Sequence, residues 1–302
     1  MGKVSQISAK VGLVDKANKP SKTDRLDALT VSKGLFPTRE SARTAIMEGV
    51  VMVDGKPVNK PGYAVKIDAA LTLSSSYAQP KYVSRGGLKL EKALQQFAVD
   101  VTGRTCLDVG ASTGGFTDCL LKHHAKFVYA IDVGYGQLDW SLRNDSRVKV
   151  LERVNARHLT PETLYEGDCP RATFVTMDVS FISIFKVLPA IVSCLDPSQA
   201  DLILLIKPQF EAGRQFVGHG GVVRDPAVHI DVLNDAIEKS RALGLAPANL
   251  SFSPVKGPKG NIEFLLHLKR KATDFAIIVD ELVQRAHSEL SQAKADEGSE
   301  SE

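Results

Sequence analysis

Cysteines are few in this sequence, and they are spaced too widely to form a metal site or a redox motif. The four of them occur singly at Cys106, Cys119, Cys169 and Cys194, and no Cys-x-x-Cys pair is present. This spacing is typical of reduced thiols in a cytoplasmic protein. The seven histidines likewise never pair at a metal-binding spacing. The sequence therefore predicts no metal site.

Long apolar segments are also missing. No run of about 18 or more apolar residues occurs, which argues against a transmembrane helix. Residues 1–20 contain lysines but lack the apolar core of a secretory signal. Hydrophobic residues still make up 43% of the chain against 24% charged residues, which is ordinary for a folded protein. We expect a globular protein of the cytoplasm that does not associate with membranes.

The net charge of +3 is unevenly distributed along the chain. Residues 1–85 hold 14 Lys and Arg against 7 Asp and Glu, a net charge of +7, whereas the other residues hold 24 against 28, a net charge of −4. A basic segment joined to a near-neutral one is typical of an appendage that binds polyanions, because neutralising phosphates releases counterions. The alternative is a solvated basic surface that binds nothing.

Residues 24–80 predict a small α+β module. A short helix that Gly34 can end is followed by a helix with Thr38 as its N-cap and Gly49 beyond its last turn. Three short strands are then expected over 50–53, 65–67 and 71–73, with the hairpin pair Asp54-Gly55 after the first. Residues 1–23 show no periodic pattern, and we expect them to form a flexible arm.

Three segments of this module resemble the S4 RNA-binding domain: Arg25-Leu26-Asp27, residues 38–43 and residues 49–56. Arg39 and Arg43 are four residues apart and share one face of the second helix, where they can meet phosphates. The resemblance implies RNA binding, while ordinary exposed helix charges are the alternative. The predicted RNA-binding residues are Arg25, Lys33, Arg39, Arg43, Lys56 and, in the following linker, Arg85.

Beyond a linker over residues 81–87, strands and helices alternate up to residue 272. Apolar strands are predicted over 106–109, 128–131, 148–151, 173–177, 202–206 and 262–268, and helices over 117–124, 184–195 and 227–243. Such alternation requires a mostly parallel sheet with helices on both faces, so we predict a doubly wound, Rossmann-like α/β domain over 88–272. Residues 273–302 should contain a helix over 274–290 and a disordered acidic tail.

A glycine-rich loop stands where the first of these strands meets a helix. Its pattern, Gly110-x-x-x-Gly114-Gly115, differs from the Gly-x-Gly-x-x-Gly of a dinucleotide site. Asp108 would repel a pyrophosphate but suits the amino group of a cationic cofactor such as S-adenosylmethionine, so a methyltransferase is favoured over the alternative, a dehydrogenase. The predicted cofactor-binding residues are Asp108, Gly110, Ser112, Gly114, Gly115, Phe116, Asp132 at the end of the next strand, and Asn155 after the third.

A lysine closes one of the buried strands, where an unpaired ammonium group would be costly. This residue, Lys207, should therefore be held by carboxylates, and Asp178 and Glu263 stand where such a sheet places its active site. Lys89 lies on the helix before the first strand, off its apolar stripe, as a second positioning cation. The glycine-rich segment 213–225 that follows Lys207 is either a flexible lid or a surface excursion, and its position favours the lid.

Lys89, Asp178, Lys207 and Glu263 resemble the Lys-Asp-Lys-Glu tetrad of FtsJ-type ribose 2′-O-methyltransferases. With residues 83–90, 108–116 and 220–226 and the S4-like module, they resemble the TlyA family of rRNA cytidine 2′-O-methyltransferases, some of which were first labelled haemolysins. The resemblance implies S-adenosylmethionine as cofactor, ribosomal RNA or ribosomal subunits as partners, and no obligate protein partner. It also implies direct methyl transfer, in which Lys207 orients the hydroxyl and assists loss of its proton. An RNA-binding protein without catalysis and a membrane-damaging toxin are the alternatives.

Overall fold

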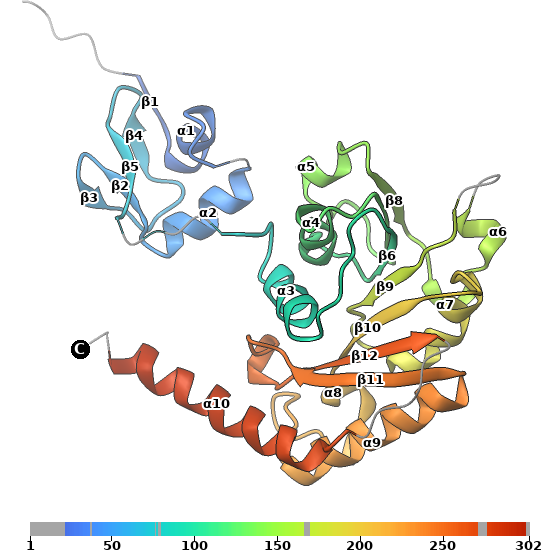
Figure 1. Ribbon diagram of the computed structural model, residues 1–302. Coiled ribbons are helices and arrows are strands. Elements are labelled where there is room, and N and C mark those ends of the chain that lie inside the picture. The colour runs from blue at the N-terminus through green and yellow to red at the C-terminus, as the bar shows by residue number, and fades with distance from the viewer. Residues whose placement is uncertain are drawn as a thin grey trace, which may run out of the picture. The chain divides into compact units, whose positions relative to one another are not determined.

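The computed structural model describes residues 22–36, 38–75, 77, 80–165, 170–270 and 277–299 (Figure 1). The chain divides into two compact units, Met1–Gln79 and Pro80–Glu302. The arm expected over residues 1–23 lies almost wholly outside the described residues, although Thr23 already belongs to a strand. Among the described residues, no helix combines the length and the apolar character that crossing a bilayer requires.

The first unit is an α+β module. Helices α1 (Leu26–Ser32) and α2 (Arg39–Met47) accompany two small antiparallel sheets. One sheet pairs β1 (Thr23–Arg25) with β4 (Ala64–Lys66), and the other has the order β3 (Lys56–Pro57), β2 (Val51–Val53), β5 (Leu71–Leu73). The predicted helices and strands are confirmed. Strands β1 and β3 were not predicted, because the three residues of β1 are polar and exposed and show no alternation, and β3 has only two residues, both exposed.

The ends of these helices follow from their sequences. Thr38 Oγ1 accepts a hydrogen bond from the Ser41 amide at 3.1 Å and caps α2, as predicted. Gly34 and Gly49 both have a φ of +74°, a left-handed conformation in which glycine ends a helix without strain. Asp54 and Gly55, with φ of +48° and +78°, form the predicted hairpin turn.

The second unit is built on a seven-stranded sheet. The strand order is β11 (Leu245–Phe252), β12 (Phe264–Arg270), β10 (Asp201–Ile206), β9 (Phe174–Met177), β6 (Thr105–Val109), β7 (Phe127–Asp132), β8 (Val148–Glu152). Strands β6 to β10 pair in parallel, whereas β12 is antiparallel to both of its neighbours. The doubly wound α/β fold is therefore confirmed.

Helices cover both faces of this sheet (Figure 1). Helices α3 (Gly86–Gln96) and α4 (Gly115–Lys122) contribute to one buried apolar cluster. On the other cluster pack α7 (Leu188–Cys194), α9 (Pro226–Ala242) and α10 (Val279–Ser299). Shorter elements complete the unit: α5 (Trp140–Arg143), η1 (Ala156–His158), α6 (Pro161–Leu164), η2 (Ile184–Lys186), α8 (Pro208–Glu211), η3 (Arg214–Phe216) and η4 (Pro258–Gly260).

Three expectations for this unit were wrong. Strand β11 was missed because it contains Pro247, which is tolerated here because β11 is an edge strand with an irregular register after that residue. The helix expected over 184–195 is divided into η2 and α7, with a proline at the start of α7. The last helix begins at Val279 and continues beyond residue 290 to Ser299, while residues 271–276 and the end of the acidic tail lie outside the described residues.

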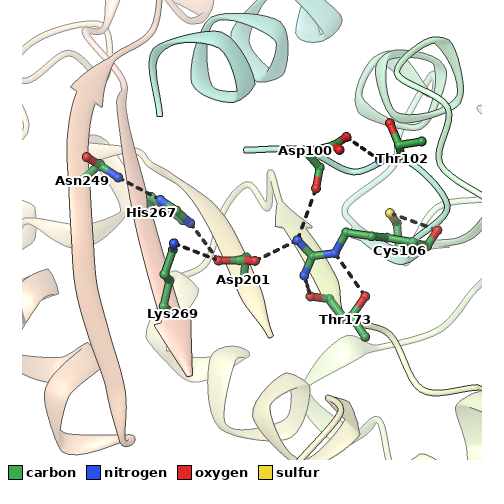
Figure 2. A network of polar contacts seen from close by, with 9 residues as sticks. Asp100, Thr102, Cys106, Thr173, Asp201, Asn249, His267 and Lys269 are labelled. Atoms are coloured by element: carbon green, nitrogen blue, oxygen red, sulfur yellow. Dashed lines mark hydrogen bonds and ion pairs between the residues drawn. The ribbon is translucent and has the colours of Figure 1, made fainter. Parts of the chain in front are cut away.

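A polar network lies at the amino end of β10, the end away from Lys207 (Figure 2). Asp201 accepts hydrogen bonds from Arg104 Nη1 at 2.8 Å and from His267 Nε2 at 3.2 Å. Asn249 Nδ2 forms a hydrogen bond of 3.1 Å with Nδ1, the other ring nitrogen of His267. Burial alone would raise the pKa of Asp201, but the hydrogen bonds from His267 and Arg104 lower it to about 2.

Because the pKa of Asp201 is lower in the folded chain than the ordinary value of 3.8, the charged form stabilises the fold. This contribution is present above about pH 4 and is lost as the pH falls toward 2. Asp201→Asn should therefore destabilise the protein by about 2 kcal/mol at pH 7, with a difference from the wild type that shrinks in acid. Urea unfolding across this pH range measures the effect, with Asp231→Asn on the exposed side of α9 as the control. A difference that does not depend on pH would contradict the assignment.

Candidate active site

The carboxyl ends of three adjacent strands bring the predicted polar residues together. Gly110 follows β6, Asp178 follows β9 and Lys207 follows β10. They border two hollows, of about 640 and about 730 Å³. The two hollows share five lining residues: Gly110, Ser112, Asp178, Ser180 and Phe181. The two hollows therefore adjoin, as a site for a cofactor and a second reactant requires.

All four residues of the predicted tetrad line the first hollow, where they form two ion pairs. Lys207 Nζ lies 2.6 Å from Asp178 Oδ1, and Lys89 Nζ lies 2.5 Å from Glu263 Oε2. The expectation that Glu263 also holds Lys207 is thus corrected, because its carboxylate is engaged by Lys89. Lys89 was expected off the apolar side of its helix, yet it is only 8% exposed. Glu263 precedes β12 rather than beginning it.

Lys207 has a further partner that was not predicted. Its Nζ donates to Ser180 Oγ at 2.7 Å. An ammonium group has three N–H donors, and Lys207 uses one of them for the hydrogen bond to Ser180 beside its ion pair with Asp178, so donor capacity remains for a reactant. Ser180 carries no charge, but it stands three residues beyond the end of a buried strand. This position at the carboxyl edge of the sheet is the signal that could have identified it.

Glu263, which lines the hollow, has an unused acceptor. The residue is fully buried, and its Oε1 has no hydrogen-bond partner among the described residues. Gly257 lies beside it, and a Cβ at that position would meet Oε1 well inside van der Waals distance. A glycine therefore leaves room for the carboxylate. Such a buried, unpaired oxygen is costly unless a bound molecule supplies a donor.

The contact between Gly257 and Glu263 leads to a test. Gly257 has an ordinary φ of −65°, so Gly257→Ala adds no backbone strain and acts by displacing the carboxylate. A displacement on the order of 1 Å should lower kcat by up to about 100-fold, while cofactor affinity and stability stay close to the wild type. Steady-state kinetics, calorimetry and thermal unfolding measure the three quantities. Unchanged kcat would argue against a role for Glu263 at this position.

The segment 213–225 forms part of the wall of the first hollow. Val217 and Gly221 line it, and a short antiparallel bridge joins Gly218 to Val222. Asn261, which is 2% exposed, fixes the segment: its Nδ2 donates to Gly221 O at 2.9 Å and its Oδ1 accepts from the Val223 amide at 3.0 Å. The segment therefore borders the site as expected, held by a residue that was not predicted; its expected flexibility stays a prediction.

The glycine-rich loop shapes the boundary between the two hollows. Gly110 has a φ of +84°, and a Cβ there would lie 2.6 Å from the Asp178 carbonyl oxygen. Only glycine allows this close approach. Ser112, Gly115 and Phe116 of the same loop line the first hollow. Gly114, at the N-cap of α4 with a φ of +96°, instead faces apolar side chains and lines neither hollow.

The acidic residues expected at the cofactor occupy different environments. Asp132 lines the second hollow together with Asn155, and its carboxylate accepts the amides of Ser112 at 2.7 Å and Gly134 at 2.6 Å. Asp108 is fully buried and lines neither hollow, because its oxygens accept the hydroxyls of Thr117 at 2.7 Å and Thr176 at 2.9 Å. The structure therefore does not support the predicted direct contact between Asp108 and the ammonium group of a cofactor.

Burial raises the pKa of Asp108 to about 6, although the two threonine hydroxyls oppose the shift. The hydrogen bonds of Asp108 join β6, β9 and α4 beneath the loop.

The glycine-rich loop, the carboxylate of Asp132 and the adjoining hollows fit S-adenosylmethionine. Glycines let the backbone approach the cofactor closely, and a carboxylate at the end of β7 suits ribose hydroxyls. Among the described residues, no group of three or more histidines, cysteines or acids is placed to hold a metal ion.

In the first unit, three of the predicted arginines surround a separate hollow. It is lined by Arg25, Asp27, Arg39, Arg43, Thr44 and Met47. Asp27 is buried and pairs with Arg25 at 2.9 Å and Arg39 at 3.1 Å. The hydrogen bond from Arg25 is the main cause that lowers the pKa of Asp27 to about 2.

The other basic residues predicted to bind RNA lie elsewhere. Lys33 Nζ donates to the Ala69 carbonyl at 2.6 Å, and Lys56 is exposed on β3. Neither lines the hollow of the first unit, so the single surface expected to include them is not formed around it. Arg85, in the second unit, lines the hollow of the tetrad.

Comparison with known proteins gives the family. The FtsJ-like methyltransferase model matches residues 82–270, and the S4 domain model matches residues 24–71. The 16S/23S rRNA (cytidine-2′-O)-methyltransferase TlyA of Mycobacterium tuberculosis is 47% identical over 268 residues, which is 89% of this chain and 97% of the relative. This chain belongs to the TlyA family of FtsJ-like methyltransferases.

Two further relatives match this TlyA-family chain over most of its length. YqxC of Bacillus subtilis is 48% identical over 282 residues, which is 91% of this chain and 98% of the relative. A protein of Streptococcus thermophilus, whose structure was solved under the name hemolysin, is 40% identical with a TM-score of 0.70, over 91% of this chain and 99% of that one. The TlyA-family chain is an S-adenosylmethionine-dependent methyltransferase with an S4 domain at its N-terminus.

Proposed function

We propose that this enzyme methylates a ribose 2′-hydroxyl of ribosomal RNA, with cytidine as the target nucleotide. The observation that carries the proposal is Lys207, whose ammonium group is held by Asp178 and Ser180 beside the glycine-rich loop. The substrate class follows the Mycobacterium tuberculosis relative, whose name specifies rRNA cytidine 2′-oxygens. Ribosomal RNA is found in the cytoplasm, so the enzyme is expected to act there, on free RNA or on ribosomal subunits.

When bound, S-adenosylmethionine supplies a methyl group attached to a positively charged sulfur. An N–H of Lys207 that neither neighbour uses would then donate to the 2′-oxygen and orient it for reaction with that methyl group. The ammonium charge also stabilises negative charge that develops on the oxygen as its proton is lost. Asp178 and Ser180 fix the direction of the amine.

The second ion pair supplies an acceptor. Lys89 holds Glu263, which lines the hollow, by its Oε2, and this leaves the buried Oε1 without a hydrogen-bond partner among the described residues. In the proposed mechanism this carboxylate oxygen would accept the hydrogen bond of the attacking hydroxyl and take its proton, while the C–S bond of the methyl donor breaks and the C–O bond forms. All four tetrad positions are thus filled within one hollow, which favours catalysis over the alternative of an RNA-binding protein without chemistry.

A direct assay tests the proposed function. Ribosomal subunits from cells that lack the enzyme should acquire ribose methylation when incubated with the purified chain and isotopically labelled methyl donor. Digestion to nucleosides should give labelled 2′-O-methylcytidine, and primer extension at low nucleotide concentration should locate it. Label in a base instead of a ribose, or none in RNA, would overturn the proposal.

The arginines of the first unit should provide RNA affinity without taking part in chemistry. Arg39→Ala combined with Arg43→Ala should weaken rRNA binding and lower the slope of log affinity against log salt by about one unit per lost phosphate contact. Affinity for the methyl donor should not change. Lys60→Ala with Lys66→Ala is the matched control, because it removes the same charge from exposed residues of this unit that lie outside the hollow and were not predicted to bind RNA. Equal losses in the two double variants would mean that only net charge matters.

A further inference from the structure

Two segments that line the active-site hollow are tied together at both ends. One follows β9 and carries Asp178 and Ser180, and the other is Lys207 with helix α8. At the first end, Lys207 Nζ contacts Asp178 Oδ1 at 2.6 Å and Ser180 Oγ at 2.7 Å. At the second end, the carboxylate of Glu211, the last residue of α8, receives two hydrogen bonds from the β9 segment.

Both oxygens of Glu211 are used for this second tie. Oε2 accepts from Ser183 Oγ at 2.6 Å, and Oε1 accepts from the Ile184 amide at 2.8 Å. Burial raises the pKa of Glu211, while these two hydrogen bonds act in the opposite direction. Lys239 also acts to lower it, but its Nζ lies 2.6 Å from Asp235. The carboxylate is therefore engaged mainly with the end of the β9 segment.

Between these two sets of contacts, the segment after β9 adopts a backbone conformation that is intrinsically unfavourable. Phe181 has a left-handed φ of +65°, which costs a residue with a side chain on the order of 1 kcal/mol. Phe181 is 90% exposed, and its ring lies 5.4 Å from the ring of Phe210 of α8, centroid to centroid. Little burial therefore stabilises this conformation, and fixed contacts at its two ends have to maintain it.

We propose that Glu211 is a positioning residue for methyl transfer: it holds the segment after β9 so that Asp178 and Ser180 meet the amine of Lys207. This inference rests on the proposed function. Glu211 itself lines neither hollow, so it acts through the segment and not on the reactants. Without the tie, Phe181 is free to relax toward an ordinary conformation, and Ser180 moves with it because the two are adjacent.

Substitutions at Glu211 in the full-length enzyme test the proposal with ribosomal subunits as substrate. Glu211→Ala should lower kcat by about 100-fold, the loss that a shift of about 1 Å in a catalytic group can produce. The KM for ribosomal subunits should stay close to the wild type. Glu211→Gln keeps an acceptor for the Ile184 amide and a donor for Ser183, so it should retain most of the activity. Near-normal kcat in a folded Glu211→Ala variant, or equal losses in the two variants, would overturn the proposal.

A double-mutant cycle separates positioning from stability alone. If Glu211 acts through Ser180, then Glu211→Ala should cost much less in the Ser180→Ala background than in the wild type, so the two effects do not multiply. Effects that multiply fully would contradict the proposal. Thermal unfolding sets an assay temperature at which every variant is folded, and Glu162→Ala, which removes an exposed carboxylate on α6, is the control.

If Glu211→Ala does not fold, Ser183→Ala removes one of the two hydrogen bonds and should also lower kcat. Full activity of Ser183→Ala would overturn the proposal. Failure of the wild type to methylate rRNA would refute the proposed function instead.

Discussion

Lys207→Ala should abolish methyl transfer while the protein remains folded and still binds both RNA and methyl donor. The substitution removes the amine that Asp178 and Ser180 hold at the hollow. A single acid–base contribution is worth about 10² to 10⁴ in rate, and the loss of an oriented donor should add to it. Single-turnover methylation, calorimetry with the methyl donor and thermal unfolding on one preparation measure all three properties.

Stability should fall only slightly in this variant, because the side chain of Asp178 is 21% exposed and water can solvate it once its partner is gone. Lys126→Ala, which removes an exposed lysine of the same unit, controls for loss of charge. A lysine that served only as an ion-pair partner would behave differently, with lowered stability and normal turnover of the folded fraction. A stable Lys207→Ala enzyme with near-wild-type turnover would refute the proposed mechanism.

Gly110→Ala should remove cofactor binding and activity together. The new methyl group would lie 2.6 Å from the Asp178 carbonyl oxygen, and the residue would have to keep a φ of +84°. Such a conformation costs a side-chain-bearing residue about 1 to 3 kcal/mol, and the neighbouring backbone cannot move aside without shifting Asp178. Affinity for S-adenosylmethionine should fall by more than about tenfold, since about 1.4 kcal/mol corresponds to tenfold.

Gly136→Ala is a suitable control for this prediction. Gly136 also has a positive φ, +72°, but nothing lies within 4 Å of a Cβ built there. It therefore carries the backbone strain without the collision. Equal losses of cofactor affinity in the two variants would show that strain alone, and not the approach to Asp178, explains the glycine.

The sequence was informative wherever local chemistry determines structure. Helix α2 has its N-cap at Thr38 and its left-handed glycine at Gly49, and both were identifiable from residue type. The strand β10 and its terminal lysine were identifiable for the same reason, because five apolar residues precede Lys207. Position at the carboxyl edge of a parallel sheet then predicted that Asp178 and Lys207 would meet.

Contacts between distant segments could not be predicted in this way. Nothing near Glu263 in sequence indicates that its partner is Lys89, 174 residues earlier, instead of Lys207. Asp108 was expected to face a cofactor because it ends a strand near the loop, but the threonines that enclose it come from α4 and β9. Glu211 was not predicted, because its contact with the Ile184 amide depends on how α8 packs against the segment after β9.

The polar network around Asp201 has a consequence for the far end of the same strand. Asp201 begins β10 and Lys207 follows its last residue, so a fixed number of residues separates the network from the amine. Successive residues of a strand point to opposite faces, and a slip by one position would turn the amine of Lys207 to the other side of the sheet. Arg104 and His267 donate hydrogen bonds to the first residue of β10, so together with the pairing of β10 with its neighbours they fix the face on which the amine of Lys207 lies.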